Sequence, residues 1–147
     1  MPLDQSLVGR TFPATAPHAV TEASVASFAQ ATGGSGSTPS GDAVPPTYPI
    51  VLAFEAMQTF LDAERVELHR IVHGEQRFTY ARPVAVGDVL TAQLEVVSLR
   101  TIGGNDLIGT SSAVTDADGQ LVCTATATLV HRGATDETTH AEPEATA

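Results

Sequence analysis

One apolar segment constrains the fold more than any other part of the chain. Within residues 50–63 the only polar side chains are Glu55, Gln58, Thr59 and Asp62. Their i, i+3, i+4, i+7 spacing forms one narrow stripe on an α-helix, so apolar side chains cover the rest of its circumference. At about 21 Å, from the rise per residue, such a helix is too short to span a bilayer. The pattern therefore predicts a helix over 50–63 that is buried on several sides.

Beyond this segment the sequence changes to the period-two alternation of β-strands. In 89–100, for example, Leu90, Ala92 and Leu94 fall on one side of a strand, and the polar residues between them fall on the other. We expect antiparallel strands over 67–80, 89–100, 106–115 and 120–131. Packing one long helix against one curved antiparallel sheet predicts a single α+β domain over residues 1–132.

The first third of the chain predicts two smaller elements and a loop. Leu7–Ala14 can form a short edge strand. Thr21 is a favourable helix N-cap, and Glu22 in the first turn suits the helix dipole, so a helix should follow and end at Gly33-Gly34. Residues 33–46, rich in Gly, Ser, Thr and Pro, are typical of a loop.

The composition narrows the classes of partner and chemistry. There are 17 acidic and 7 basic side chains, which give a formal net charge of −10. This charge argues against nucleic-acid and anionic-membrane partners, because phosphate binding needs a basic surface. All the basic residues are arginine, which excludes Schiff-base lysine chemistry and the lysine-containing phosphate-binding loop.

The two ends of the chain and its one cysteine indicate the compartment. Residues 133–147 contain acidic but no lysine or arginine side chains, which predicts an acidic, disordered tail. The first ten residues lack the apolar core of a signal peptide, so we expect a cytoplasmic protein. Cys123 cannot form an internal disulfide and is expected to be a small buried hydrophobe.

Several short motifs occur in an order that resembles the MaoC-like dehydratases, in particular their N-terminal or FAS1-like branch. The resemblance extends from about residue 7 to 132. It is carried by the runs Phe28-Ala29-Gln30-Ala31-Thr32-Gly33-Gly34, Pro45-Pro46-Thr47-Tyr48-Pro49-Ile50, His73-Gly74-Glu75-Gln76-Arg77-Phe78, Arg82-Pro83 and Gly87-Asp88. The family implies a hot dog fold, in which a curved antiparallel sheet wraps one long helix.

The resemblance also implies an activity and a pair of catalytic residues. Such proteins hydrate trans-2-enoyl thioesters of CoA or acyl carrier protein, or dehydrate (3R)-3-hydroxyacyl thioesters. They use an Asp and a His, five residues apart, in the loop before the long helix, for proton transfer. In this chain the aligned positions hold Gly34 and Pro39, which cannot transfer a proton. Some members are heterodimers in which one subunit has lost this pair, and this sequence resembles that subunit.

Three functional hypotheses follow. The first is an accessory subunit that shapes the acyl channel of a catalytic MaoC-like partner and binds acyl-CoA or acyl-ACP. The second is a self-sufficient enzyme, either a dehydratase with relocated groups at Asp42, Glu55 or His73, or an acyl thioesterase that uses Glu55. The third is a homodimeric binder of acyl or polyketide intermediates without chemistry. Dimerisation is expected in each case, because a single hot dog sheet leaves an edge strand uncovered.

The candidate site residues come from the start of the long helix and from the strand that follows it in the sequence. Thr47 and Tyr48, at its start, are expected to line the substrate cleft, where free backbone N–H groups gather. His73 is a third substrate-binding candidate, and its spacing from Glu75 predicts that both lie on one strand face. We expect Glu55 to pair with Arg77 or Arg82. Catalytic groups of this chain's own, a metal site and a cofactor are not expected.

Overall fold

The computed structural model describes residues 3–33 and 44–133. Asp42, the aligned positions Gly34 and Pro39, and the predicted tail from residue 134 onward therefore lie outside the described residues. The helices are α1 (Glu22–Ala31) and α2 (Ile50–Ala63), with short 3-10 helices at Gln5–Leu7 and Leu68–Arg70. The strands are β1 (His18–Ala19), β2 (Ile71–Tyr80), β3 (Val89–Ile102), β4 (Asn105–Thr115) and β5 (Leu121–His131).

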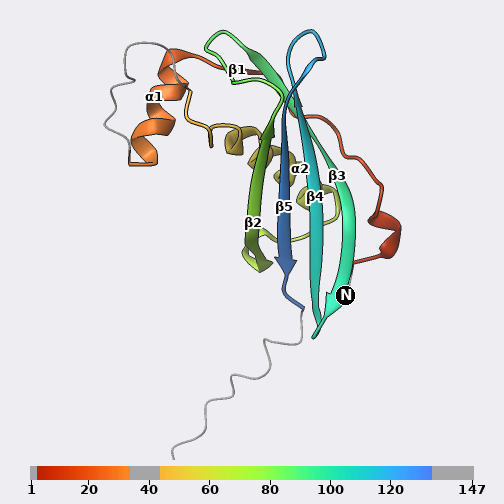
Figure 1. Cartoon of the computed structure of the whole chain (residues 1–147). Helices are drawn as coiled ribbons and strands as arrows, with labels where there is room; N and C mark the ends of the chain where they lie inside the picture. Colours follow the sequence, from red (N-terminus) through yellow and green to blue (C-terminus); the bar gives the residue numbers. More distant parts are fainter. Residues whose placement is uncertain (1–2, 34–43, 134–147) are drawn as a thin grey trace, which may run out of the picture.

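The strands form one curved antiparallel sheet that wraps around α2. Their order across the sheet is β1-β3-β4-β5-β2, so β2 pairs with β5 although β3 follows it in the chain. In Figure 1, α2 lies behind the strands, and α1 lies apart from the sheet, beyond the end of the sheet at which α2 begins. The predicted α+β architecture is confirmed. Among the described residues, no helix is long and apolar enough to cross a membrane.

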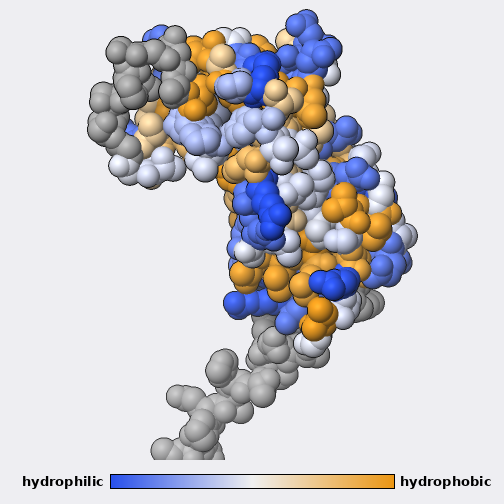
Figure 2. Space-filling view, in the orientation of Figure 1, coloured by the Kyte–Doolittle hydropathy of each residue, from blue (hydrophilic) through white to orange (hydrophobic). Residues whose placement is uncertain are grey.

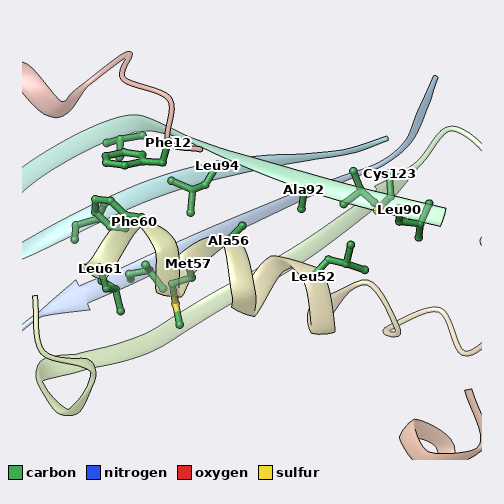
Figure 3. Packing of buried hydrophobic residues seen from close by; sticks show 14 of the residues in the cluster. Phe12, Leu52, Ala56, Met57, Phe60, Leu61, Leu90, Ala92, Leu94 and Cys123 are labelled. Carbon is green, nitrogen blue, oxygen red and sulfur yellow. The ribbon is translucent and has the colours of Figure 1, made fainter. Parts of the chain in front are cut away.

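The core lies between α2 and the concave face of the sheet (Figure 3). Leu52 and Phe60 have no exposed surface, and the ring of Phe60 meets that of Phe12 edge-on with the centroids 4.9 Å apart. On β3, Leu90 and Leu94 face the helix, as the alternation predicts. The helix bounds agree with the prediction, but burial is not complete, since Phe54 is 44% exposed.

Strand β2 differs from the prediction in two ways. The chain from Leu68 to Arg70 is a 3-10 helix, so the strand begins four residues after Glu67. A β-bulge at Gly74 then shifts the register, so that His73 pairs with Leu129 and Glu75 with Thr128. Neighbours on adjacent strands share a face, and Leu129 is in the core. The prediction that His73 and Glu75 share one strand face is therefore wrong.

The segment before α1 also differs from the prediction. Leu7–Ala14 is not a regular strand; a 3-10 helix ends at Leu7, and the following residues run along β3. Gly9 and Phe12 donate backbone hydrogen bonds to Val96 and Leu94, and Thr11 makes an isolated bridge to Glu95. This segment covers the β3 edge of the sheet over the length that the two-residue β1 leaves open.

Helix α1 begins as predicted. The Thr21 hydroxyl accepts a hydrogen bond from the Ser24 N–H at 3.0 Å, and the Ser24 hydroxyl accepts one from the Thr21 N–H at 2.9 Å. This reciprocal capping box satisfies two backbone donors that a helix end leaves free. After α1, Gly33 adopts a φ of +88°, a conformation that glycine enters without steric cost.

The outer face of the sheet faces the viewer in Figure 2. Hydrophobic patches lie among hydrophilic side chains over this face. Val97, Ile102 and Leu121 contribute exposed apolar surface. The outer face is therefore mixed in character, in contrast to the apolar concave face that packs on α2.

Candidate functional site

A buried tyrosine joins three elements at the start of α2. Tyr48 is 1% exposed, and its hydroxyl lies 2.6 Å from His18 Nε2 of β1 and 2.9 Å from Ser24 Oγ of α1. The ring also meets Phe28 edge-on, with the centroids 5.5 Å apart. These contacts fix α1 and β1 against the residues that enter α2, and they occupy the Tyr48 hydroxyl. We call Tyr48, His18 and Ser24 the tyrosine network.

An open depression of about 390 Å³ lies beside this entry to α2. One wall is formed by Val44, Pro45 and Pro46, and the other by residues 80–84, where the chain leaves β2. The Tyr80 hydroxyl donates a hydrogen bond to the Pro46 carbonyl across it. Burial raises the pKa of Tyr80 to about 12, so this phenol stays protonated at neutral pH and remains a donor. Thr47, adjacent to this wall, is exposed.

Arg82, in the wall of the depression, is held by two carboxylates. It donates to both oxygens of Asp88, at 2.8 and 3.3 Å, and to Asp116 at 3.1 Å. The hydrogen bond from Arg82 lowers the pKa of Asp88, and that of Asp116 is lowered first by the Gln120 N–H and then by Arg82. The expectation that Glu55 pairs with Arg77 or Arg82 is wrong, because Arg77 pairs instead with Glu75.

A second, narrower space lies along the side of α2 that faces β2. We call it the α2 crevice; its lining residues are Ala53, Met57, His73, Gln76, Leu94, Thr110, Ser112, Ala125, Ala127 and Leu129. The sheet wall combines small side chains on β4 and β5 with larger ones such as Leu94 and Leu129, and Met57 extends from α2 toward the β2 side (Figure 3). The crevice leaves about 10 Å³ of open space, close to what a single water molecule requires.

His73 and Gln76 are the polar residues that β2 contributes to this crevice. His73 Nε2 lies 2.9 Å from Gln76 Oε1, and both residues are on the concave face because the bulge at Gly74 advances the register. His73 itself is exposed, which places the pair at the boundary between the crevice and solvent. The structure thus places His73 beside Ala53 and Met57, roughly 8 to 14 Å along the helix axis from Tyr48.

The predicted site residues therefore do not converge on one point. Thr47 and Tyr48 lie at the start of α2, and His73 lies beside its middle. Their roles in substrate binding remain predictions. Glu55 is exposed, and its side chain makes no hydrogen bond or ion pair with the described residues. Asp42 lies outside the described residues.

The one contact between an aspartate and a histidine in the described ranges lies elsewhere. His131 Nδ1 is 3.5 Å from Asp106 Oδ2, where β4 begins and β5 ends. Cys123 of β5 pairs with Tyr80, which lies at the α2 entry. From Cys123 to His131 the strand rises roughly 26 Å, so the contact between Asp106 and His131 is far from that entry. Burial alone would raise the pKa of Asp106, but hydrogen bonds from the Leu3 N–H and Thr101 outweigh it, and the pKa is lowered.

The sequence gives weak signals for the tyrosine network. His18 follows a proline and precedes the α1 N-cap, and this sequence context predicts no function for it. Its partner Tyr48 is 30 residues away, and no local spacing predicts that contact. Across residues 3–33 and 44–133, no group of three or more His, Cys, Asp or Glu side chains is arranged to hold a metal ion.

Comparisons with known proteins place this fold and these motifs in one family. Residues 6–125 match the family model described as FAS1-like, dehydratase domain region. The chain is 40% identical over 146 residues to a UPF0336 protein of Clavibacter michiganensis, an alignment that covers 90% of this chain and 98% of that protein. It is 36% identical over 147 residues to a UPF0336 protein of Streptomyces coelicolor, with 91% and 98% covered.

Solved structures agree with this assignment. The C-terminally truncated HadBC (3R-hydroxyacyl-ACP dehydratase) complex of Mycobacterium tuberculosis contains a chain that superposes with a TM-score of 0.71 at 26% identity, covering 88% of this chain and 99% of that one. The (R)-hydratase of A. caviae involved in PHA biosynthesis shares the fold, with a TM-score of 0.60 at 21% identity and coverage of 86% and 98%. The chain therefore belongs to the FAS1-like dehydratase family, within the MaoC-like proteins of hot dog fold.

Proposed function

We propose that this chain is the accessory subunit of a MaoC-like (3R)-3-hydroxyacyl thioester dehydratase, and that it helps to hold the acyl chain while a partner supplies the Asp/His pair. The observation that carries this proposal is the tyrosine network at the start of α2. Within the described residues, the side chain of His18 is hydrogen-bonded to the Tyr48 hydroxyl and to no carboxylate. Because its Nε2 is held by Tyr48 and no carboxylate of the described residues lies beside it, His18 does not reproduce the Asp/His pair that the family resemblance implies.

The sequence of the loop before α2 supports the same proposal. Gly34 and Pro39 occupy the positions at which the family resemblance implies the catalytic Asp and His, and neither side chain can transfer a proton. The solved HadBC (3R-hydroxyacyl-ACP dehydratase) complex is a related assembly that contains a chain similar to this one. A two-chain enzyme of this kind accounts for a dehydratase-like fold without its own acid and base.

The open edge of β2 supports a partner subunit. Strand β2 is last in the sheet order and, within the part of the chain that the structure describes, pairs only with β5, whereas the opposite edge is covered by the segment along β3. Val72 on β2 is 42% exposed, and Phe54 on α2 is 44% exposed. An uncovered edge strand with apolar neighbours favours addition of a second sheet, which would place the partner next to the α2 crevice.

The first experiment is reconstitution with a MaoC-like chain from the same genome that retains the Asp/His pair. Hydration of crotonyl-CoA is followed by the loss of enoyl absorbance, with this chain alone, the partner alone and the two together. We expect no turnover by this chain alone and full activity only in the mixture. Sustained turnover by the pure chain would rule out the accessory role.

Two matched variants locate the interface. Val72→Lys places a charge on the open β2 edge, and Val97→Lys places the same charge on the outer face, where Val97 is 47% exposed. We expect Val72→Lys to abolish the heterodimer in multi-angle light scattering and Val97→Lys to leave it intact. Equal behaviour of the two variants would contradict pairing through β2.

A second candidate function has one specific observation in its favour. The Glu55 carboxylate is exposed on α2 and has no partner within the described residues, so it is free to act as the acid or base of a hot dog thioesterase. Release of CoA from acyl-CoA by the pure chain, lost in Glu55→Gln, would establish this function. Absence of CoA release by the wild-type chain excludes it.

A further inference from the structure

One row of cross-strand neighbours on the outer face of the sheet has opposite charges at its two ends. The row crosses β2, β5, β4 and β3, and its members in that order are Arg77, Thr126, Ser111 and Glu95. Residues adjacent to the row in the chain, such as Val96 and Ala125, are in the core, so the row itself faces outward. Three strand spacings, roughly 14 Å, separate its charged ends.

The charges along the two edges of this face are arranged with opposite signs. On β2, Arg77 is ion-paired with Glu75, which lies one row farther toward the end of the sheet where β2 begins and β3 ends. In the same direction along β3, Glu95 is followed by Arg100, and neither makes an ion pair with the described residues. The β2 edge is therefore positive and then negative, and the β3 edge is negative and then positive.

A hollow of about 240 Å³ lies on this face beside an exposed valine. Glu75 and Arg77 line it on the β2 side, and Val97 lines it on the β3 side. Thr126 and Thr128, between them, have short side chains. Val97 is the extra residue of a β-bulge in β3 and is 47% exposed. The β2 side of the hollow lies beyond the reach of this valine within one chain.

We propose that the outer face of the sheet binds a second copy of this chain, back to back, about a two-fold axis that runs parallel to the strands between β4 and β5. Such an axis exchanges the β2 and β3 edges, so Arg77 of each copy meets Glu95 of the other. Glu75 of each copy then lies next to Arg100 of the other. A two-fold contact needs a surface that is complementary to itself, and these edge charges provide one.

The size and relief of the face suit sheet-on-sheet packing. Packed sheets lie about 10 Å apart with their strands within about 30° of each other, and the short side chains of Ser111 and Thr126 at the centre permit that approach. Val97 of each copy then covers the hollow of the other. Four strands of at least ten residues cover roughly 650 Å², near the ~800 Å² per partner of a standard interface.

The charges favour a second copy over another class of partner. A strongly acidic or basic partner requires a surface with one sign of charge. The edges of the outer face instead carry two arginines and two glutamates, whose formal charges cancel: Glu75, Arg77, Glu95 and Arg100. The mixed character of this face in Figure 2 agrees with a surface that recognises itself.

The test is a charge swap, measured by sedimentation velocity of the purified full chain. We expect self-association whose Kd rises about tenfold to a hundredfold in Arg77→Glu and in Glu95→Arg, because each reversal occurs twice in a symmetric dimer. The double variant R77E/E95R should restore the wild-type Kd, since it re-creates both ion pairs with exchanged signs. Circular dichroism confirms that each variant is folded.

Three results would overturn the proposal. The first is a wild-type chain that stays monomeric up to about 100 μM, a concentration far above the Kd of a specific dimer of this size. The second is self-association that neither reversal weakens, which would place the contact on another surface. The third is a double variant that associates no more tightly than the single variants.

A second pair of variants tests the apolar contact. Val97→Ser should raise the Kd about tenfold, because each dimer buries two of these valines. Leu121→Ser is the matched control: Leu121 is equally exposed, at 47%, but lies roughly 17 Å along β5 from Thr126. The control should leave the Kd unchanged. An equal loss in both variants would indicate non-specific apolar association and would contradict the proposed contact.

The outer-face contact is independent of the proposed function, because the catalytic partner is expected at the β2 edge. In the reconstituted pair, Glu95→Arg should separate the assembly into single heterodimers that keep the full hydration rate. Failure of the charge swap with hydration retained overturns the outer-face contact alone. Absence of hydration together with a successful charge swap overturns the accessory role alone.

Discussion

Removal of one hydroxyl from the tyrosine network tests whether it holds the entry to α2 in place. Tyr48→Phe keeps the buried ring but deletes the oxygen that lies 2.6 Å from His18 Nε2 and 2.9 Å from Ser24 Oγ. The Ser24 hydroxyl keeps its contacts to Thr21, whereas the His18 nitrogen loses its protein partner. At about 0.5 to 1.5 kcal/mol for each of the two net hydrogen bonds, the variant should lose roughly 1 to 3 kcal/mol of stability.

Equilibrium unfolding in urea at pH 7 measures this loss. The expected result is a lower midpoint with an unchanged slope, because the change removes contacts without altering the surface exposed on unfolding. The variants Tyr48→Phe and His18→Ala and their combination complete a double-mutant cycle, for which we expect a coupling of about 1 kcal/mol. A loss below about 0.3 kcal/mol, or strict additivity, would refute the reasoning that the network holds these elements together.

Two further predictions concern the far end of the sheet and its outer face. The pKa of Asp106 is lowered in the folded chain. The stability that its ionised carboxylate contributes is therefore present above the unfolded pKa near 3.8 and is lost as pH falls through the lower folded pKa. The stability difference between wild type and Asp106→Asn in urea should therefore be largest at pH 7 and should shrink below pH 3.8. A Cβ at Gly109 would lie 2.2 Å from Ser98 Oγ, so Gly109→Ala forces that hydroxyl to rotate and should cost about 1 kcal/mol in urea unfolding. The cost should vanish in a Ser98→Ala background, and an equal cost in both backgrounds would contradict the steric explanation.

The elements with strong periodicity were predictable from the sequence. The polar stripe that includes Glu55 and Asp62 gives the bounds of α2, and the alternation around Leu94 gives the buried face of β3. These patterns depend on local geometry, which repeats every 3.6 residues in a helix and every two in a strand. The capping of α1 by Thr21 was predictable for the same reason, because its partners lie within one turn.

The features that sequence patterns missed depend on contacts between distant segments. The bulge at Gly74 inserts one residue and thereby puts His73 and Glu75 on opposite faces of the sheet. Its position is visible only in the pairing with β5. The contact between His18 and Tyr48 joins positions 30 residues apart. The α2 crevice likewise combines side chains from α2 and four strands, so its lining could not be found from local spacing.

The location of the catalytic groups is the central question about function. The most direct measurement is the crotonyl-CoA hydration rate of the reconstituted pair when the catalytic aspartate of the MaoC-like partner is changed to asparagine. We predict complete loss of hydration while the heterodimer stays intact in light scattering. Residual activity that disappears when Asp42, Glu55 or His73 of this chain is substituted would contradict the account and would assign the chemistry to this chain.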